Sequence, residues 1–249
     1  MKSIFSILQK IGRAFMLPIA VLPMAGTLLG VGGAFTNPTL ISTYNLRFLE
    51  PGQPMNYFLV LCSNAGSFVF GNLPLLFAVG IAIGLANINK ETAALSAVLG
   101  FLLFHTVIST ILGFQGLSPE NVTSEAFIAA GKSAGQAAGL ASLYTRELGI
   151  FTLQTGVFGG IICGIVSALL TNKFSNVALP DYLAFFSGNR LVPVMTMIVF
   201  IPVAFLFPFF WPIVFKGIVR AGEAFSSMGY FGTFLYGFSM RLLNVFGLH

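Results

Sequence analysis

Charged residues are scarce in this chain, and their scarcity excludes a surface that faces water. Asp, Glu, Lys and Arg together make up 8% of the 249 residues, whereas a soluble domain carries about 25%. Hydrophobic residues make up 56%, and the mean hydropathy is +0.92. Lipid must therefore cover what water covers in a soluble protein. The 28 Phe and 28 Gly agree with this, because Phe partitions readily into hydrocarbon and Gly lets helices approach closely.

Cysteines, histidines and carboxylates are also few, which excludes several kinds of site. Cys62 and Cys163 both lie in apolar runs, so neither a disulfide framework nor a metal cluster is expected. The two histidines lie far apart, and the 7 acidic residues fall almost all in linkers, which disfavours a hydrolytic centre in the membrane. The 12 cations are scattered singly, which argues against nucleic acid as a partner. The sequence predicts no cofactor and no metal.

Long apolar stretches define the architecture, because a transmembrane helix needs about 20 mainly apolar residues. We therefore expect an all-α, polytopic integral membrane protein with about six transmembrane segments. They are residues 14–35, 68–86, 93–113, 150–170, 191–215 and 230–248. Pro18, Pro23 and Pro74 predict kinks within the first two, because each proline removes a backbone donor.

The cations beside these segments predict the orientation, because they prefer the cytoplasmic side. An N-terminus in the cytoplasm leaves more cations inside than outside. Those inside are Lys2, Lys10, Arg13, Lys90, Lys173 and Arg190, and those outside are Arg47, Lys132 and Arg146. Lys216 and Arg220 then also fall outside and argue weakly the other way. Two alternatives stay open: the proline-interrupted segment 191–215 does not cross simply, or residues 212–227 lie along the surface as an amphipathic helix.

Glycines at four-residue spacing predict where helices pack. Gly80 and Gly84 share one face of the second apolar stretch, and Gly156, Gly160 and Gly164 share one face of the fourth. Small residues at this spacing let two backbones approach closely. We expect helices to pack on these faces, and we expect the chain to associate through them.

One cation falls inside an apolar stretch. Arg241 lies in the last candidate segment, where an Arg costs about 3 kcal/mol or more unless it faces a wet cavity or a partner. His249 follows about 12 Å further along a continuous helix, a spacing that suits a sugar-sized solute. The alternative is that Arg241 reaches to the membrane interface. His105, in the third apolar stretch, is better explained as a structural residue whose ring nitrogens bond a neighbouring helix.

Four segments in order resemble a known family. They are residues 8–32, 72–86, 179–193 and 241–249. Together they resemble the membrane (IIC) component of phosphotransferase-system sugar permeases, in the glucose, maltose and N-acetylglucosamine group. Residues 179–193 are similar to the most specific signature of that group, a cytoplasmic LPxxLxFFxGxRxVP segment. Residues 241–249 resemble a segment that ends in a Gly-Leu-His-His pair.

The resemblance implies group translocation across the bacterial cytoplasmic membrane. In such permeases a IIC homodimer binds a sugar, carries it across, and presents its 6-hydroxyl to a phosphocysteine on a cytoplasmic IIB domain. The partners are then the sugar, the IIB and IIA phosphocarrier domains, the lipid bilayer and a second copy. Glucose or maltose is the expected sugar. The resemblance assigns sugar binding to Arg241 and His249. Arg190 and Gly188, in the segment expected on the cytoplasmic side, are candidates for a gate or for contact with the phosphodonor domain, and the alternative is that Arg190 is only a cation that anchors the cytoplasmic side.

The chain also departs from the family pattern. Neither the second half of the membrane domain, with its glutamate in a Thr-x-Pro-x-Glu segment, nor a phosphocysteine domain is present in these residues. We interpret residues 1–249 as the N-terminal part of the IIC domain, with scaffold and dimerisation spans in 14–215. Residues 216–249 are then a linker helix and the start of the sugar-binding region. We expect no catalytic residue in this part and no phosphorylation by it alone. The alternative is a secondary transporter or channel without phosphoryl chemistry.

Overall fold

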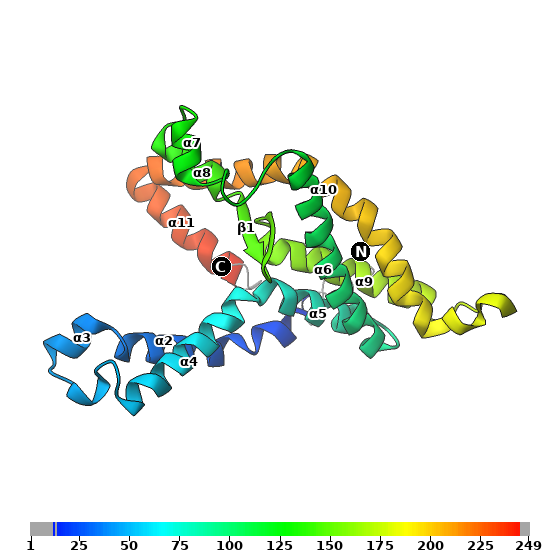
Figure 1. Cartoon of the computed structure of the whole chain (residues 1–249), viewed down its shortest axis with the longest axis horizontal. Coiled ribbons are helices and arrows are strands. Elements are labelled where there is room, and N and C mark those ends of the chain that lie inside the picture. Colours follow the sequence, from blue (N-terminus) through cyan, green and yellow to red (C-terminus); the bar gives the residue numbers. More distant parts are fainter. Residues whose placement is uncertain (1–11, 13, 245–249) are drawn as a thin grey trace.

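The computed structural model describes residue 12 and residues 14–244, and these are mostly helical (Figure 1). Residues 14–19 form a helix that runs on into α2 after a short turn. The helices that follow are α2 (Leu22–Phe35), α3 (Pro38–Thr43), α4 (Pro54–Gly71), α5 (Leu73–Leu85), α6 (Lys90–Phe114), α7 (Ser124–Ala129), α8 (Ala134–Ala141), α9 (Gly156–Phe174), α10 (Leu191–Ser227) and α11 (Gly229–Asn244). Two strands, β1 (Tyr144–Glu147) and β2 (Ile150–Leu153), and three short 3₁₀ helices, η1 (Arg47–Leu49), η2 (Asp181–Phe186) and η3 (Gly188–Arg190), complete the described chain.

Four segments are helical, long and apolar enough to cross a membrane. Within the described residues they are Ala14–Phe35, Lys90–Phe114, Gly156–Phe174 and Gly188–Arg220. A fifth crossing arises if the bent pair α4 and α5 counts as one broken span. The all-α, polytopic class is thereby confirmed. The last expected segment is described only as far as Asn244, where α11 has 16 residues.

Two expected segment boundaries differ from those of the structure, and both differences have a local cause. The second segment does not begin at residue 68: helix α4 begins at Pro54, and a bend of 58° separates it from α5. Pro74 lies in the first turn of α5, where its missing N–H and fixed φ allow a helix to start but not to continue from α4. The fourth segment begins with a β-hairpin rather than a helix. Leu148 and Gly149 both have positive φ, the backbone that a tight two-residue hairpin turn requires.

Helix α10 is too long for a simple perpendicular crossing. Its 37 residues correspond to about 55 Å of helix, against about 30 Å of hydrocarbon. Pro202, Pro208 and Pro212 lie inside it, and the helix changes direction along its course (Figure 1). The residues from 212 to 227, for which a separate surface helix was one alternative, continue α10 without a break. Helix α11 then folds back against α10.

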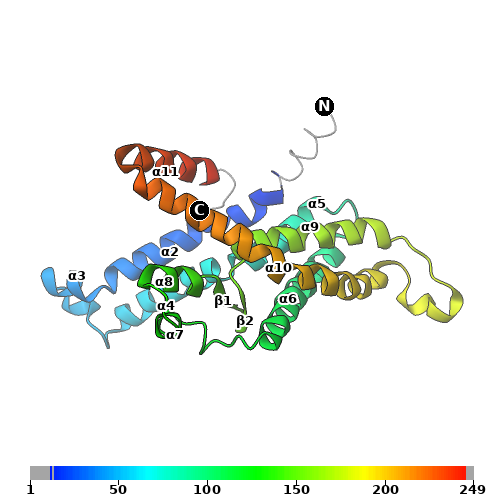
Figure 2. The same ribbon diagram turned by 90° about the horizontal axis from the view of Figure 1, so that it is seen from above.

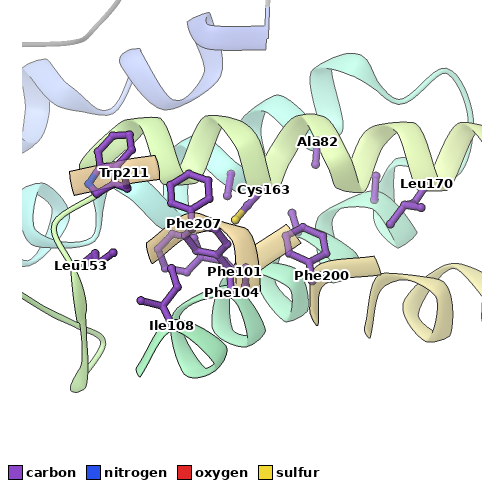
Figure 3. Close-up of a cluster of buried hydrophobic side chains, with 14 of the residues drawn as sticks. Ala82, Phe101, Phe104, Ile108, Leu153, Cys163, Leu170, Phe200, Phe207 and Trp211 are labelled. Carbon is purple, nitrogen blue, oxygen red and sulfur yellow. The ribbon is translucent and has the colours of Figure 1, made fainter. Parts of the chain in front are cut away.

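The core lies where α5, α6, α9 and α10 meet (Figure 3). Phe104 of α6 and Phe207 of α10 meet edge to face, with ring centroids 4.6 Å apart, and Trp211 stacks on Phe207 at 5.5 Å. The indole Nε1 of Trp211 donates a hydrogen bond of 2.9 Å to the carbonyl oxygen of Gln154. This bond ties α10 to the segment between β2 and α9, so the hairpin closes one end of the core.

Glycines set the distance between the core helices. A Cβ added to Gly160 would overlap the Pro74 carbonyl of α5, and one added to Gly164 would lie 2.6 Å from the Ala78 oxygen. Gly80 and Gly84 of α5 likewise meet the first helix, at Pro18 and Ala14. The expectation of close helix packing is confirmed for these four glycines. Because the chain itself covers their faces, they are not available for association with a second copy.

The fifth glycine of the two predicted faces behaves differently. Gly156 has a φ of +51°, and a Cβ at this position would meet nothing within 4 Å. Gly156 therefore lets the backbone turn into the start of α9 and is not part of the packing face, because a positive φ strains residues other than glycine.

Replacing Gly160 with alanine should loosen the contact between α5 and α9. The added methyl group overlaps the Pro74 carbonyl, and overpacking of this kind costs about 1–3 kcal/mol. In a chain of this length each kcal/mol lowers the melting temperature by about 2–4 °C. The fluorescence of Trp211, the single tryptophan, measured during heating in mild detergent, reports the change.

The matched control is Gly113→Ala in α6, where an added Cβ meets nothing within 4 Å. It should leave the melting temperature unchanged or raise it slightly, since alanine favours helix more than glycine does. An equal fall in both variants would contradict the assigned role of Gly160.

Candidate functional site

The loop between α9 and α10 holds two of the predicted site residues, Gly188 and Arg190. It projects from one end of the molecule (Figures 1 and 2). Its two sides are joined by a hydrogen bond of 2.9 Å from the Gly188 N–H to the Val177 oxygen and another of 2.9 Å from the Leu179 N–H to Ser187 Oγ. Gly188 has a φ of +66°, which L side chains adopt only under strain. Its role in the structure is therefore to shape the loop.

Arg190 is exposed and lies against the loop that precedes it. Its Nη1 donates a hydrogen bond of 3.2 Å to the Phe185 oxygen, and its guanidinium carbon lies 4.8 Å from the centroid of the Phe185 ring. A cation over an aromatic face is attracted by the ring quadrupole. Tyr182 is 83% exposed and Phe185 69%. The loop thus presents aromatic side chains and one cation, without an ion pair of Arg190 to any residue that the structure describes, and it can receive an anionic group beside an apolar surface.

Arg241 lies in the last turn of α11 and is exposed. Its guanidinium makes no hydrogen bond or ion pair with another described residue. Phe231, Phe234 and Phe238 stack in sequence along the same helix, at centroid distances of 6.3 and 6.5 Å. His249, its predicted partner, lies outside the described residues. The geometry of a site between the two is therefore a prediction rather than an observation.

The structure does not bring the two predicted groups together. In both views the loop with Gly188 and Arg190 projects from one end of the molecule and lies far from α11 (Figures 1 and 2). They are two separate surfaces, which agrees with two separate roles.

His105 is a buried structural residue, as expected, although its partner is not a helix. Its Nδ1 lies 3.0 Å from Thr152 Oγ1 on β2, and its ring meets the edges of Phe101 and Phe104 at 4.5 and 5.1 Å. The apolar sequence around His105 did not indicate the hairpin that supplies this partner. In β1, burial raises the pKa of the Glu147 carboxyl. Among the residues that the structure describes, no three His, Cys, Asp or Glu side chains gather where a metal ion could bind.

Sequence analysis missed one cluster of cations. Lys132 lies beside Lys216 and Arg220, around a cavity between α8 and α10. The three are scattered singly along the chain, and only the folded chain brings them around one cavity. No sequence signal short of that tertiary contact could have found the cluster.

The described chain is a multi-pass α-helical membrane protein with prolines inside its spans and with the loop 179–190 and α11 on separate surfaces. Comparison with known families gives its particular type. Residues 12–249 match the family described as "Phosphotransferase system, EIIC". Since the match covers nearly the whole chain, the chain belongs to this family, and the resemblance carried by the four sequence segments is confirmed.

The chain is also similar to a curated protein of the same family. The glucose-specific EIICBA component of the phosphotransferase system of Staphylococcus saprophyticus is 41% identical to this chain over 250 residues. The alignment covers 100% of this chain and 34% of that protein. The chain therefore spans about a third of the length of this relative.

Proposed function

We propose that this chain is the membrane-embedded part of a glucose-type permease of the phosphotransferase system, which binds a hexose and moves it across the membrane while it is phosphorylated. The observation that carries the proposal is the alignment of the whole chain with a glucose-specific EIICBA component at 41% identity. The name of that relative favours glucose over maltose. A secondary transporter without phosphoryl chemistry is not favoured, because the family match covers residues 12–249.

The reaction assigned to such a permease needs a phosphorylated partner domain. The oxygen of the sugar 6-hydroxyl attacks the phosphorus of a phosphocysteine on IIB, the S–P bond breaks, the cysteine leaves as thiolate, and the hydroxyl gives up its proton. Phosphoryl transfer depends mainly on positioning and on stabilising the charge of the transferred group. The part proposed for this chain is therefore to hold the sugar and to dock the donor. The exposed aromatic side chains and the guanidinium of Arg190 support docking at the loop 179–190.

For sugar binding we assign Arg241 together with His249. A neutral sugar has several hydroxyl groups that must find partners in an apolar surrounding, since unpaired polar groups are costly there. The exposed guanidinium of Arg241, without a partner among the described residues, supports the assignment because its donors are available.

Arg241→Ala, made in the complete gene product, should weaken sugar affinity by about tenfold or more, which is the effect of losing a hydrogen bond from a charged group. The sugar affinity of Arg241→Lys should lie between those of the unchanged protein and of Arg241→Ala, since lysine keeps the charge and loses the planar fork of donors. Equilibrium binding of radiolabelled glucose to membranes, with maltose as competitor, measures both the loss and the preference between sugars. Lys90→Ala, at the start of α6, is the control and should leave affinity unchanged. Unaltered affinity in both Arg241 variants would remove Arg241 from the site.

The proposed function requires the loop 179–190 to face the cytoplasm, as does the N-terminus. Asn189 is exposed in η3 and suits a cysteine probe: Asn189→Cys in a Cys62→Ser background should react with a membrane-impermeant maleimide in inverted vesicles and stay unlabelled in sealed cells. The native Cys163 is buried and should not react. Labelling of Asn189→Cys in sealed cells would mean that the loop faces the outside, and it would contradict the proposed orientation.

A homodimer also belongs to the proposal. The hairpin of α2 and α4 projects from the rest of the molecule (Figure 1) and exposes large apolar side chains, such as Leu61 at 67% and Phe68 at 69%. A second copy could cover this surface. Leu61→Cys in the Cys62→Ser background should cross-link two copies in membranes, whereas Leu169→Cys on α9, which is 62% exposed, should not. Equal cross-linking at the two positions, or none at Leu61→Cys, would contradict this interface.

A further inference from the structure

A cavity of about 450 Å³ lies between α8 and the second half of α10. Its walls come from segments far apart in the sequence, the long linker after α6 and the stretch from Phe215 to Arg220. Gly135 and Gly139 of α8 border it without side chains, and a Cβ added at either would meet nothing within 4 Å. The space is therefore open to an occupant.

Three cations surround this cavity, namely Lys132, Lys216 and Arg220. All three side chains are exposed, none of them forms a hydrogen bond or an ion pair with a described residue, and no carboxylate is among the described residues that line the cavity. Like charges around one cavity repel one another, so an anion bound between them would lower the electrostatic energy. Lys132 also lies just before the first turn of α8, and the positive end of the helix dipole adds to the same field.

The cationic side of the cavity adjoins an apolar one. Along α10, Lys216 and Arg220 are four residues apart and form one stripe, and Phe215 and Val219 form the stripe next to it. Leu140 of α8 adds another apolar side chain to the lining of the cavity. Both cations lie in the last part of α10, beyond Pro212, which is the last proline inside this helix.

From these features we propose that the cavity binds the phosphodiester headgroup of an anionic phospholipid. The phosphate lies among Lys132, Lys216 and Arg220, and the first acyl carbons lie on Phe215, Val219 and Leu140. A free phosphate ion would use the same cations and leave the apolar wall uncovered. The apolar wall therefore favours lipid as the source of the phosphate. The site is distinct from the loop 179–190 and from Arg241, and it does not depend on the proposed sugar.

The test titrates the purified chain in detergent micelles with phosphatidylglycerol, phosphatidylcholine and inorganic phosphate, and counts bound molecules by native mass spectrometry. Phosphatidylglycerol should bind about tenfold more tightly than phosphatidylcholine, and inorganic phosphate should not be retained. The combined variant K132Q/K216Q/R220Q should lose about tenfold or more in affinity for phosphatidylglycerol, since each cation near a membrane surface contributes about fivefold. A matched variant with the same change in charge, R47Q/K90Q/K173Q, should bind as the unchanged chain does.

A second variant separates the cavity from charge alone. Gly139→Leu fills the open space without altering charge, and it should weaken phosphatidylglycerol binding while the melting curve followed by Trp211 stays in place. Equal loss in the two charge variants would mean that general surface charge attracts the lipid and would overturn the site. Equal affinity for phosphatidylglycerol and phosphatidylcholine would overturn the role of the cations. Retention of inorganic phosphate as tight as that of phosphatidylglycerol would overturn the lipid as its source.

Discussion

Helices α5 and α9 approach until the backbone of one touches that of the other, and most of the described fold is arranged around this contact. The approach is possible because Gly160 and Gly164 of α9 meet the carbonyl groups of Pro74 and Ala78 without a side chain between them. In lipid the hydrophobic effect does not drive helices together, so association depends on close packing of this kind. At the far end of the pair, Asn172 donates to the Leu85 oxygen and accepts from the Asn87 N–H. The pair thus has a fixed geometry, on which α6 and α10 build the aromatic core.

Hydrogen bonds also join the small hairpin to the described core. Two hydrogen bonds tie the hairpin and the residues after it to the helices: Trp211 Nε1 donates to the Gln154 carbonyl oxygen, and Thr152 Oγ1 lies 3.0 Å from His105 Nδ1. A non-helical segment within the bundle is tolerated in a membrane protein because protein, rather than lipid, surrounds it. The surfaces that remain polar lie at the ends, on the loop 179–190 and around the cavity beside α8. Docking and headgroup binding are therefore proposed at the ends of the bundle and not within it.

Composition and apolar run length were enough to predict the class, because the cost of charge in lipid leaves few alternatives for such a sequence. The packing role of four of the five spaced glycines was predicted correctly, since small residues repeated every four positions lie on one face of a helix. The kink at Pro74 was predicted, but the start of α4 at Pro54 and the hairpin at Leu148 and Gly149 were missed, because both depend on where an element starts and not on hydropathy. The cluster of Lys132, Lys216 and Arg220 was beyond prediction, as it exists only once the chain has folded around the cavity. His249 lies outside the described residues, so the sugar site rests on resemblance.

The bend between α4 and α5 has a mechanical consequence. The turn at residues 20 and 21 interrupts the first span near the same level, and α2 and α4 pack against each other beyond the two breaks. The hairpin is therefore an arm joined to the bundle through two neighbouring pivots. Helix α4 has 18 residues, or about 27 Å of length, so a rotation of about 10° at the pivots moves its tip by about 5 Å. A small angular change at Asn72 is thereby converted into a displacement comparable to the spacing of one helical turn, while the glycine contacts of the core stay in register.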